Sequence, residues 1–511
     1  MTLASGNNRR IAKNTVMLYI RMLLLMLVNL YTSRIVINAL GVEDYGLYSI
    51  VGSVVICLGF VNSSMTAASQ RFLAYSKGKG DIREQIRMFN SVSIAHYIIA
   101  FFIFIIAETG GIFYIENYLN VAHEKIPTAH FVFQFSLCSL LIKTSCVPYN
   151  ASIIANERMS AFALLSILEA GLQLSVAIIL RYILANQLIW YAFMMFFTVF
   201  CTQMGYMLYS RTHFQECRLC HAWDKKTVKD VFSYSGWNLL GTLSSVAIDQ
   251  GVNMLLNSFF GVIVNAARGI AFQVSGAIAS LSGNFQQAMN PQIVKSYACG
   301  DLANMHQLIL KGTRFSFFLI LIFSAPIFFN ITSVLTIWLG FVPEYAAVFC
   351  QLILINALIS ACSGPLLTGA MATGQIKKYQ LIVASINLLN LPVSWVVLKF
   401  FPNPYLTVYI MIVLSIIAFV TRLFLVSEMI GLSKKQFLKQ TISRVFVVAL
   451  IIGCVLGIIY TNLASSVSLL LLLVRIFLSF LFVVGVILII GITPNERRNI
   501  MQIIRTRLSH I

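Results

Sequence analysis

Long apolar segments recur from one end of the chain to the other, separated by short polar stretches. A helix needs roughly 20 mostly apolar residues to cross the hydrocarbon core of a membrane. We predict transmembrane helices at residues 15–38, 46–68, 89–111, 129–150, 160–183, 188–210, 231–257, 267–290, 311–335, 346–370, 379–400, 406–427, 444–462 and 468–491. The pattern therefore predicts an all-α polytopic membrane protein with fourteen spans.

Composition supports this class. Of the 511 residues, 59% are hydrophobic and 10% are charged, and the mean hydropathy is +0.85. The connections between predicted spans are short, which leaves no room for a soluble catalytic domain. The first apolar run is too long for the core of a cleaved signal peptide, and no small-residue cleavage pattern follows it.

The net charge of +19 is distributed unevenly. Most basic residues fall in the N-terminal tail, in every second connection and in the C-terminal tail. On the opposite side we find almost none beyond Lys125 and Lys399. Basic loops mark the cytoplasmic side of a membrane protein, so we expect both termini in the cytoplasm and the basic loops near anionic lipid headgroups. This distribution argues against nucleic-acid binding.

One cysteine cluster lies between the sixth and seventh predicted spans. The stretch HFQECRLCHAW contains Cys217, Cys220 and His221 in the pattern C-x-x-C-H, with His213 nearby. The string matches a c-type haem attachment motif, but such attachment occurs outside the cytoplasm. Reduced cytoplasmic thiols and a zinc site are the two remaining interpretations. We expect no cofactor and assign no metal ligand.

The chain also shows weak internal similarity at an offset of about 220 residues. The matching pairs are NALGVEDYG with NSFFGVIVNA, AYSKGKGDI with SYACGDL, and PYNASIIANERM with PLLTGAMATGQI. Six helices separate the copies, and an even number makes the repeats parallel, with a cavity expected between two pseudo-twofold lobes. We predict lobes at 1–222 and 223–443, followed by two further helices and a tail at 444–511. Two lobes around a central site are typical of transporters.

Two predicted helices of the second lobe carry polar residues at intervals of three or four, which places these residues on one face of each helix. The residues are Asn238, Thr242, Ser245, Asp249, Asn253 and Asn257 in one helix, and Gln273, Gly276, Ser280, Asn284 and Gln287 in the next. Such faces line a cavity or pack closely against another helix. Close packing suits Ser, Thr and Gly better than it suits Asp, Asn and Gln, so we favour a cavity lining.

Charged residues deep in a membrane are costly and therefore mark candidate functional sites. The deep basic residues Arg21, Arg34 and Lys143 all belong to the first lobe. The deep acids are Asp249 in the second lobe and Glu169 in the first. Arg21 and Arg34 lie near helix ends, so snorkelling to the membrane surface is the alternative for both.

Three other arginines lie at predicted helix ends, where we expect them at the membrane surface. They are Arg181, Arg268 and Arg422.

The start of the chain, NTVMLYIRMLLLMLVNLYTSRIVINALGVEDYGLYSIVGSVV, resembles that of bacterial polysaccharide flippases of the Wzx, or O-antigen, type. These belong to the MOP superfamily, which includes MATE drug exporters and the lipid II flippase. Their hallmark is an arginine at the end of the first helix and a turn of the form LG-x-x-D/E-[YF]-G-x-Y. Here these positions are Arg34, Leu40, Gly41, Asp44, Tyr45, Gly46 and Tyr48. The helix count, the two lobes and the Pro148 and Pro365 segments fit a MATE-like fold over nearly the whole chain.

The resemblance implies a flippase that moves undecaprenyl-diphosphate-linked oligosaccharide across the inner membrane by alternating access, for surface polysaccharide biosynthesis. Arg21, Arg34 and Lys143 would hold the diphosphate, because arginine binds phosphate oxygens in a fork. The sugars would contact polar residues of the second lobe, namely Asn238, Thr242, Asn253, Gln273, Asn284 and Gln287. Asp249 or Glu169 would couple the motion to Na⁺ or H⁺. Membrane lipids and other polysaccharide-assembly proteins are the further partners implied.

Three alternatives remain. A MATE-type antiporter for organic cations would favour acids over bases in its cavity, whereas the first lobe here is basic. Lipid II is a second cargo with the same diphosphate chemistry. An enzyme such as a membrane glycan polymerase or ligase would need catalytic groups in a sizeable outer loop. The longest outer segment, ETGGIFYIENYLNVAHEKIPTAH, carries Glu108, Glu116, Glu124 and His123, but a solvated loop explains them, so we predict a non-enzyme.

Overall fold

The computed structural model describes residues 2–117, 123–183, 185–218, 220, 222–260, 262–339, 342–461, 468–493 and 496–497. Within these ranges every regular element is a helix, which confirms the all-α prediction. The longer helices are α1 (Thr2–Lys79), α2 (Ile82–Ile106), α4 (Ile126–Ala155), α5 (Met159–Leu180), α6 (Gln187–His213), α7 (Lys225–Phe260), α8 (Val262–Ala298), α9 (Leu302–Phe329), α11 (Ala346–Thr373), α12 (Lys377–Leu388), α13 (Asn390–Phe400), α14 (Leu406–Ile430), α16 (Ser443–Thr461) and α17 (Leu469–Val486).

Short helical segments complete these elements. They are η1 (Ala107–Gly111), α3 (Ile112–Asn117), η2 (His123–Lys125), η3 (Gln215–Cys217), α10 (Ile331–Leu339), α15 (Lys434–Phe437), η4 (Leu438–Ile442) and η5 (Ile487–Gly491).

In the described part of the chain, eleven helices are long and apolar enough to cross a membrane. They coincide with eleven of the predicted spans. The span predicted at 267–290 is also helical, as part of α8, but α8 is not among these eleven helices. The number of fourteen spans stays a prediction.

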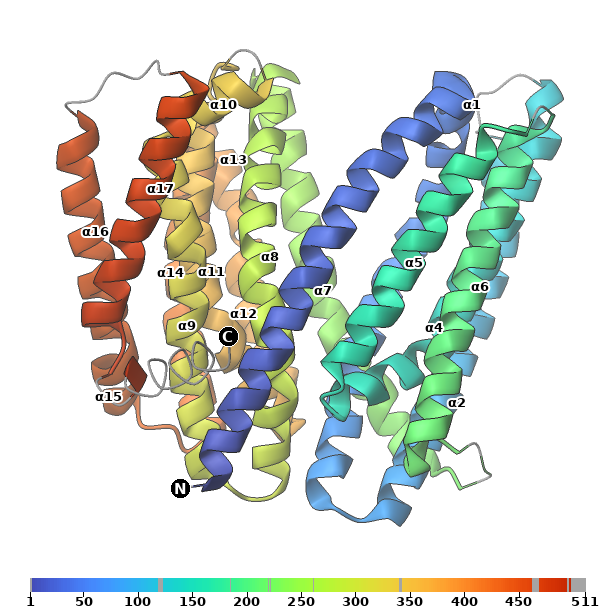
Figure 1. Cartoon of the computed structure of the whole chain (residues 1–511), viewed down its shortest axis with the longest axis horizontal. Coiled ribbons are helices and arrows are strands. Elements are labelled where there is room, and N and C mark those ends of the chain that lie inside the picture. Colours follow the sequence, from blue (N-terminus) through green and yellow to red (C-terminus); the bar gives the residue numbers. More distant parts are fainter. Residues whose placement is uncertain are drawn as a thin grey trace, which may run out of the picture. The chain divides into compact units, whose positions relative to one another are not determined.

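The first two predicted spans belong to one helical element. The sequence predicts a break near NALGVEDYG, whereas α1 runs without interruption from Thr2 to Lys79. Figure 1 shows this ribbon rising from the N-terminus and returning, so the two spans are the two arms of a bent helix. The chain contains no proline between these ends, and hence no residue whose missing N–H would end the backbone ladder.

The described chain forms two compact units. Unit 1 contains residues 1–242 and 288–301, and unit 2 contains residues 243–287 and 302–511. These boundaries lie inside α7 and α8, so each of these two helices contributes one part to each unit. The lobe boundaries at 222–223 and 443–444 follow the sequence repeat and stay a prediction.

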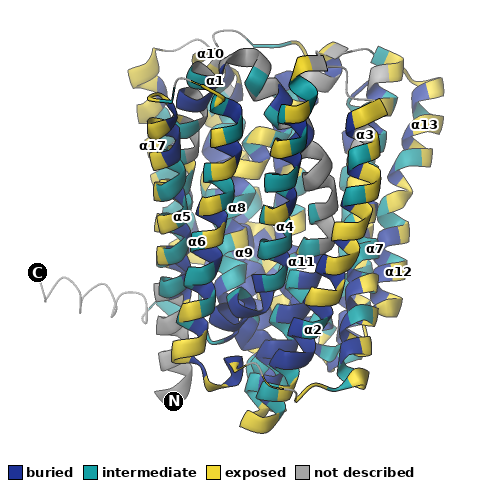
Figure 2. Ribbon diagram, turned by 90° about the vertical axis from the view of Figure 1, so that its right-hand side faces the viewer, coloured by how far each residue is buried: buried dark blue, intermediate teal, exposed yellow. Residues whose placement is uncertain are grey.

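Each unit has its own apolar core. In unit 1, α2 and α4 meet where the rings of Phe89 and Tyr149 contact edge to face at 5.2 Å, and both side chains are buried. In unit 2, Phe349 and Cys350 of α11 are fully buried in one cluster, and Val448 and Val483 join α16 and α17 to α9 in another. In Figure 2 many helices show turns in yellow, teal and dark blue, because one strip of each such helix packs while another is exposed.

The two prolines matched by the sequence repeat occupy similar places. Pro148 lies inside α4 and Pro365 inside α11, both buried and both near the C-terminal end of the helix. The helices continue to Ala155 and Thr373, a few residues beyond the predicted ends. This similarity supports the proposed duplication.

Candidate functional site

A cluster of charged and aromatic side chains lies in unit 1, where α1, α4, α5 and α6 contribute to it. The guanidinium of Arg21, on α1, stacks over the ring of Phe162 on α5, with 4.6 Å between its central carbon and the ring centroid. A cation over an aromatic face is held by the ring quadrupole. Arg21 is therefore packed against α5.

Lys143 and Glu169 form the ionic part of this cluster. Lys143 Nζ, on α4, lies 3.5 Å from Glu169 Oε1, on α5. The Lys143 side chain is 43% exposed and that of Glu169 22%, so neither side chain is fully enclosed by the protein. The Glu169 carboxylate also acts electrostatically on Arg21. The structure thus brings together two of the three predicted phosphate-binding cations and one of the two predicted coupling acids.

The spacing along α5 explains why these groups meet. Phe162, Ser166 and Glu169 are separated by four and three residues, so they share one helix face. Ser166 and Tyr206 of α6 are buried and joined by a hydrogen bond of 3.0 Å between their hydroxyl oxygens. This bond fixes α5 against α6 between the aromatic end and the charged end of the cluster.

The cluster carries more positive than negative charge, and one of its buried donors has no acceptor among the described residues. Arg21 Nε is buried, and no described residue accepts a hydrogen bond from it. Two cations face a single carboxylate, which leaves one positive charge in excess. An unsatisfied buried donor is costly. The arrangement suits a ligand that supplies negative charge and several acceptor oxygens.

Arg34, the third predicted phosphate-binding residue, lies in α1. Its side chain falls outside the described part of the structure, so its role stays a prediction.

A second charged cluster lies in unit 2, around Arg268 of α8. This side chain is buried, with 3% of its surface exposed. Arg268 Nη2 lies 3.6 Å from Asp249 Oδ1 of α7, and Nη1 donates to the Asp249 carbonyl oxygen at 3.3 Å and to Asn253 Oδ1. The guanidinium also lies over the ring of Phe272, at 4.5 Å. Asp249 thus has a specific cationic partner, while its side chain stays 52% exposed.

The expectation that Arg268 lies at a helix end is wrong. α8 begins at Val262, five residues before the predicted span, so Arg268 lies inside the helix rather than at its end. Asp249 and Asn253 are one helical turn apart and therefore present two acceptors on the same side of α7. The sequence pattern shows this spacing, but it does not identify Arg268 as the partner of the two side chains.

Two of the remaining polar-stripe residues, Asn238 and Thr242, make hydrogen bonds to backbone carbonyl groups. Asn238 is buried, and its Nδ2 donates to the carbonyl oxygen of Ser64 on α1 at 3.2 Å. Thr242 Oγ1 donates to the carbonyl oxygen of Asn238 at 3.2 Å. The Asn238 bond joins two helices, which is the packing role that the sequence left as the alternative, whereas the Thr242 bond lies within α7.

Further along the stripe, Gln273 is exposed, whereas Asn284 and Gln287 are half-buried. The side chain of Asn257 lies outside the described residues.

The turn motif that carries the family resemblance contacts the start of α4. Asp44 Oδ1 lies 2.7 Å from Lys125 Nζ, immediately before α4 begins. The ring of Tyr48 contacts that of Tyr191 on α6 at 4.9 Å. Asp44 and Lys125 also line an open hollow of about 270 Å³ with Asn186 and Gln187. The motif therefore joins α1 to α4 and α6.

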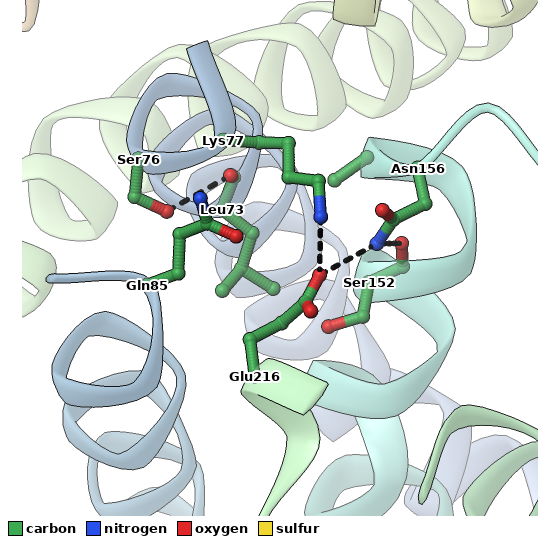
Figure 3. Close-up of a pocket in the computed structure, with 8 residues that line it drawn as sticks. Leu73, Ser76, Lys77, Gln85, Ser152, Asn156 and Glu216 are labelled. Atoms are coloured by element: carbon green, nitrogen blue, oxygen red, sulfur yellow. Dashed lines mark hydrogen bonds and ion pairs between the residues drawn. The ribbon is translucent and has the colours of Figure 1, made fainter. Parts of the chain in front are cut away.

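The connection between α6 and α7 is tied to the rest of unit 1 through Glu216. Its Oε1 accepts hydrogen bonds from Lys77 Nζ at 3.1 Å and from Asn156 Nδ2 at 2.9 Å, as Figure 3 shows. Burial raises the pKa of Glu216, but the hydrogen bond from Asn156 and the Lys77 ammonium outweigh it, so the pKa lies below its ordinary value. The adjoining cavity measures about 10 Å³, at the lower limit for one water molecule, and cannot hold a lipid headgroup.

The cysteine motif nearby has one buried thiol and one exposed thiol. Cys217 is fully buried, and burial raises its pKa to about 12. Cys220 is exposed, and His221 lies outside the described residues. A cysteine binds zinc as the thiolate, so the surroundings of Cys217 oppose metal binding. No cluster of three potential metal ligands occurs among the residues the structure describes.

Comparison with known proteins identifies the fold. No protein-family model and no curated protein matches the sequence. Among solved structures, a MATE transporter in complex with MaD3S superposes with a TM-score of 0.71 and 14% identity, over 83% of this chain and 97% of that one. An outward-facing multidrug resistance MATE transporter of the MOP superfamily gives 0.69 and 14%, over 83% and 96%. A MOP superfamily transporter from Pyrococcus furiosus gives 0.64 and 15%, over 83% and 96%.

These likenesses cover most of each chain, so the protein has the MATE fold. The Wzx-type subtype indicated by the sequence resemblance is a finer assignment and belongs to the proposal below.

Proposed function

We propose that this protein is a membrane transporter that flips an undecaprenyl-diphosphate-linked oligosaccharide to the outer leaflet by alternating access. The observation that carries the proposal is the excess of positive charge at the Arg21, Lys143 and Glu169 cluster. A diphosphate diester carries a negative charge on each phosphate and offers several acceptor oxygens. The Arg21 guanidinium would contribute positive charge and the donors of its outer nitrogens, and Lys143, which is 43% exposed, would act as a point charge.

The second unit supplies candidate contacts for the glycan. Gln273 is exposed and Asn284 is half-buried on α8, and both have amide groups that can bond to sugar hydroxyls. Asn253 is occupied by Arg268, and Asn238 by Ser64. We retain the predicted polar residues of both helices as sugar contacts, with the exposed Gln273 first among them, and retain Arg34 as a third phosphate ligand.

The polarity of the site distinguishes this proposal from a drug antiporter. A carrier of organic cations would present carboxylates, whereas cations outnumber carboxylates in the unit 1 cluster. The MOP superfamily transporter from Pyrococcus furiosus is itself described as having a binding pocket of reverse polarity that suggests a different function. That description supports the view that pocket polarity varies with function within this fold. Lipid II, which has the same diphosphate chemistry, stays the second candidate cargo.

The proposed setting is the bacterial inner membrane, with both termini in the cytoplasm and with membrane lipids as neighbours. The driving ion would be Na⁺ or H⁺. Asp249 is one coupling candidate, since it is half-exposed and also paired with Arg268. The protein would act with other polysaccharide-assembly proteins and would not itself be an enzyme.

Deletion of the gene tests the proposal in cells. Lipid-linked glycan should accumulate on the inner leaflet, and surface polysaccharide should be lost. Wild-type protein should restore both, and an Arg21→Ala, Lys143→Ala double variant at normal protein levels should restore neither. Normal surface glycan in the deletion strain would contradict the proposed function, as would full rescue by the double variant.

A further inference from the structure

We propose that Glu169 is a built-in counter-anion that competes with the cargo diphosphate for Arg21 and Lys143. The inference rests on the proposed function and assigns a role to the acid within the same cluster. Glu169 would set the affinity of the site and allow release of the cargo, rather than contact the cargo favourably.

The contacts of Glu169 fit this role. Its carboxylate lies 3.5 Å from Lys143 Nζ, which is longer than a hydrogen bond, and it also acts on the Arg21 guanidinium. Each helix packed around it contributes one group: Arg21 from α1, Lys143 from α4 and Tyr206 from α6. The carboxylate therefore lies in the electric field of both cations and makes no close bond to Lys143.

The burial of the same groups argues against a purely structural ion pair. The fold depends strongly on an ion pair when both partners are buried, because removal of one leaves the other charge uncompensated; Arg314 and Glu496 form such a pair in unit 2. Lys143 is 43% exposed and Glu169 22% exposed. Exposed pairs contribute little to stability. An acid at this position is therefore better suited to compete with an anionic cargo for the two cations than to stabilise the fold.

The charges give the expected effect on binding. With Glu169 in place, the two cations have one excess positive charge. With a neutral amide at this position, both charges become available to the two phosphates. Removing a like charge within a few ångströms of a bound anion should tighten binding by about tenfold. The tighter binding should appear mainly as a slower dissociation rate, because the Glu169 carboxylate speeds dissociation when it pairs with the cations in place of the cargo.

The test uses the full-length protein in detergent, with inorganic pyrophosphate and geranyl diphosphate as probes in calorimetry. Glu169→Gln should bind both probes about tenfold more tightly than the wild type, with slower dissociation of geranyl diphosphate. Glu169→Ala should also bind both probes more tightly. This second variant keeps the test decisive if Glu169→Gln does not fold. The matched control is Glu108→Gln, because Glu108 contacts Gln134 instead of the cluster.

The possible outcomes separate the inference from the proposed function. If the folded wild type binds neither probe and the Glu169 variants do not bind them either, the diphosphate proposal fails. If the wild type binds and both Glu169 variants bind equally or more weakly, the counter-anion role is overturned while the proposed function stands. If Glu108→Gln tightens binding as much as Glu169→Gln, the effect is one of overall charge and the inference is also overturned.

Discussion

Glu157 Oε1 accepts a hydrogen bond from Lys295 Nζ at 2.7 Å, and joins the turn between α4 and α5 to the end of α8 within unit 1. The second carboxylate oxygen accepts from Gln292 Nε2 at 3.0 Å, and the carbonyl oxygen accepts from Asn14 Nδ2 at 3.2 Å. Glu157 is buried and has a φ of 59°, a left-handed conformation that costs a side chain free energy. The contacts of both oxygens compensate for that cost.

We predict that substitution of Glu157 separates these two effects. Glu157→Ala keeps the unfavourable backbone conformation and loses the carboxylate, so the free energy of unfolding should fall by about 2–3 kcal/mol. Glu157→Gly loses the same contacts without the steric cost of Cβ, and should be about 1 kcal/mol more stable than Glu157→Ala. Thermal unfolding in detergent measures both. The control is Glu84→Ala at the exposed Lys79 pair, where the change should stay near zero. Equal stability of the alanine and glycine variants would contradict the account.

The Arg268 cluster gives a second prediction. Arg268→Ala removes a buried side chain that bonds to Asp249 and Asn253 and stacks on Phe272, so unfolding free energy should fall by about 2–3 kcal/mol. Asp249→Asn keeps an acceptor on a half-exposed side chain and should cost less than about 1 kcal/mol. The melting temperatures of the two purified variants provide the comparison. A larger loss for Asp249→Asn than for Arg268→Ala would show that the carboxylate is the more important partner.

The unit 1 cluster and the Arg268 cluster show how much of the candidate site could be predicted from the sequence. The long apolar segments predicted the helices, because a segment of this length and composition crosses a membrane as a helix. It also selected Arg21, Lys143 and Glu169 individually, since deep charges are conspicuous in apolar segments. Their proximity depends on how α1, α4, α5 and α6 pack, which no single-helix pattern contains. The burial of Arg268 was missed for a similar reason: its exposure depends on α7.

We predict a pH dependence of stability at the Glu216 contact. The pKa of Glu216 is lower in the folded protein than its ordinary value of 4.5. A lowered carboxyl pKa stabilises the fold above the ordinary value, and the contribution is lost as the pH falls below it. The Glu216→Gln variant should therefore be less stable than the wild type at pH 7, and the difference should shrink below pH 4.5. A difference that does not change across this range would rule out the charge as its source.

The two cysteines of the C-x-x-C-H motif should differ in reactivity. Cys217 is fully buried and its pKa is raised to about 12 by burial, whereas Cys220 is exposed. In a chain where the other cysteines are replaced by serine, a maleimide at pH 7.5 should label Cys220 and leave Cys217 unmodified until the protein is unfolded. Zinc should not protect Cys220. Equal labelling of both thiols in the folded protein, or protection by zinc, would contradict the placement of Cys217.

The central claim is that the unit 1 cluster recognises a diphosphate on a lipid carrier. The most direct measurement reconstitutes the protein in liposomes and follows the transfer of a fluorescent, undecaprenyl-diphosphate-linked sugar between leaflets. The account predicts protein-dependent transfer that is lost in the Arg21→Ala, Lys143→Ala double variant, while Arg181→Ala, at the end of α5, keeps it. Undiminished transfer by the double variant, or equal transfer of a matched lipid without phosphate, would contradict the claim.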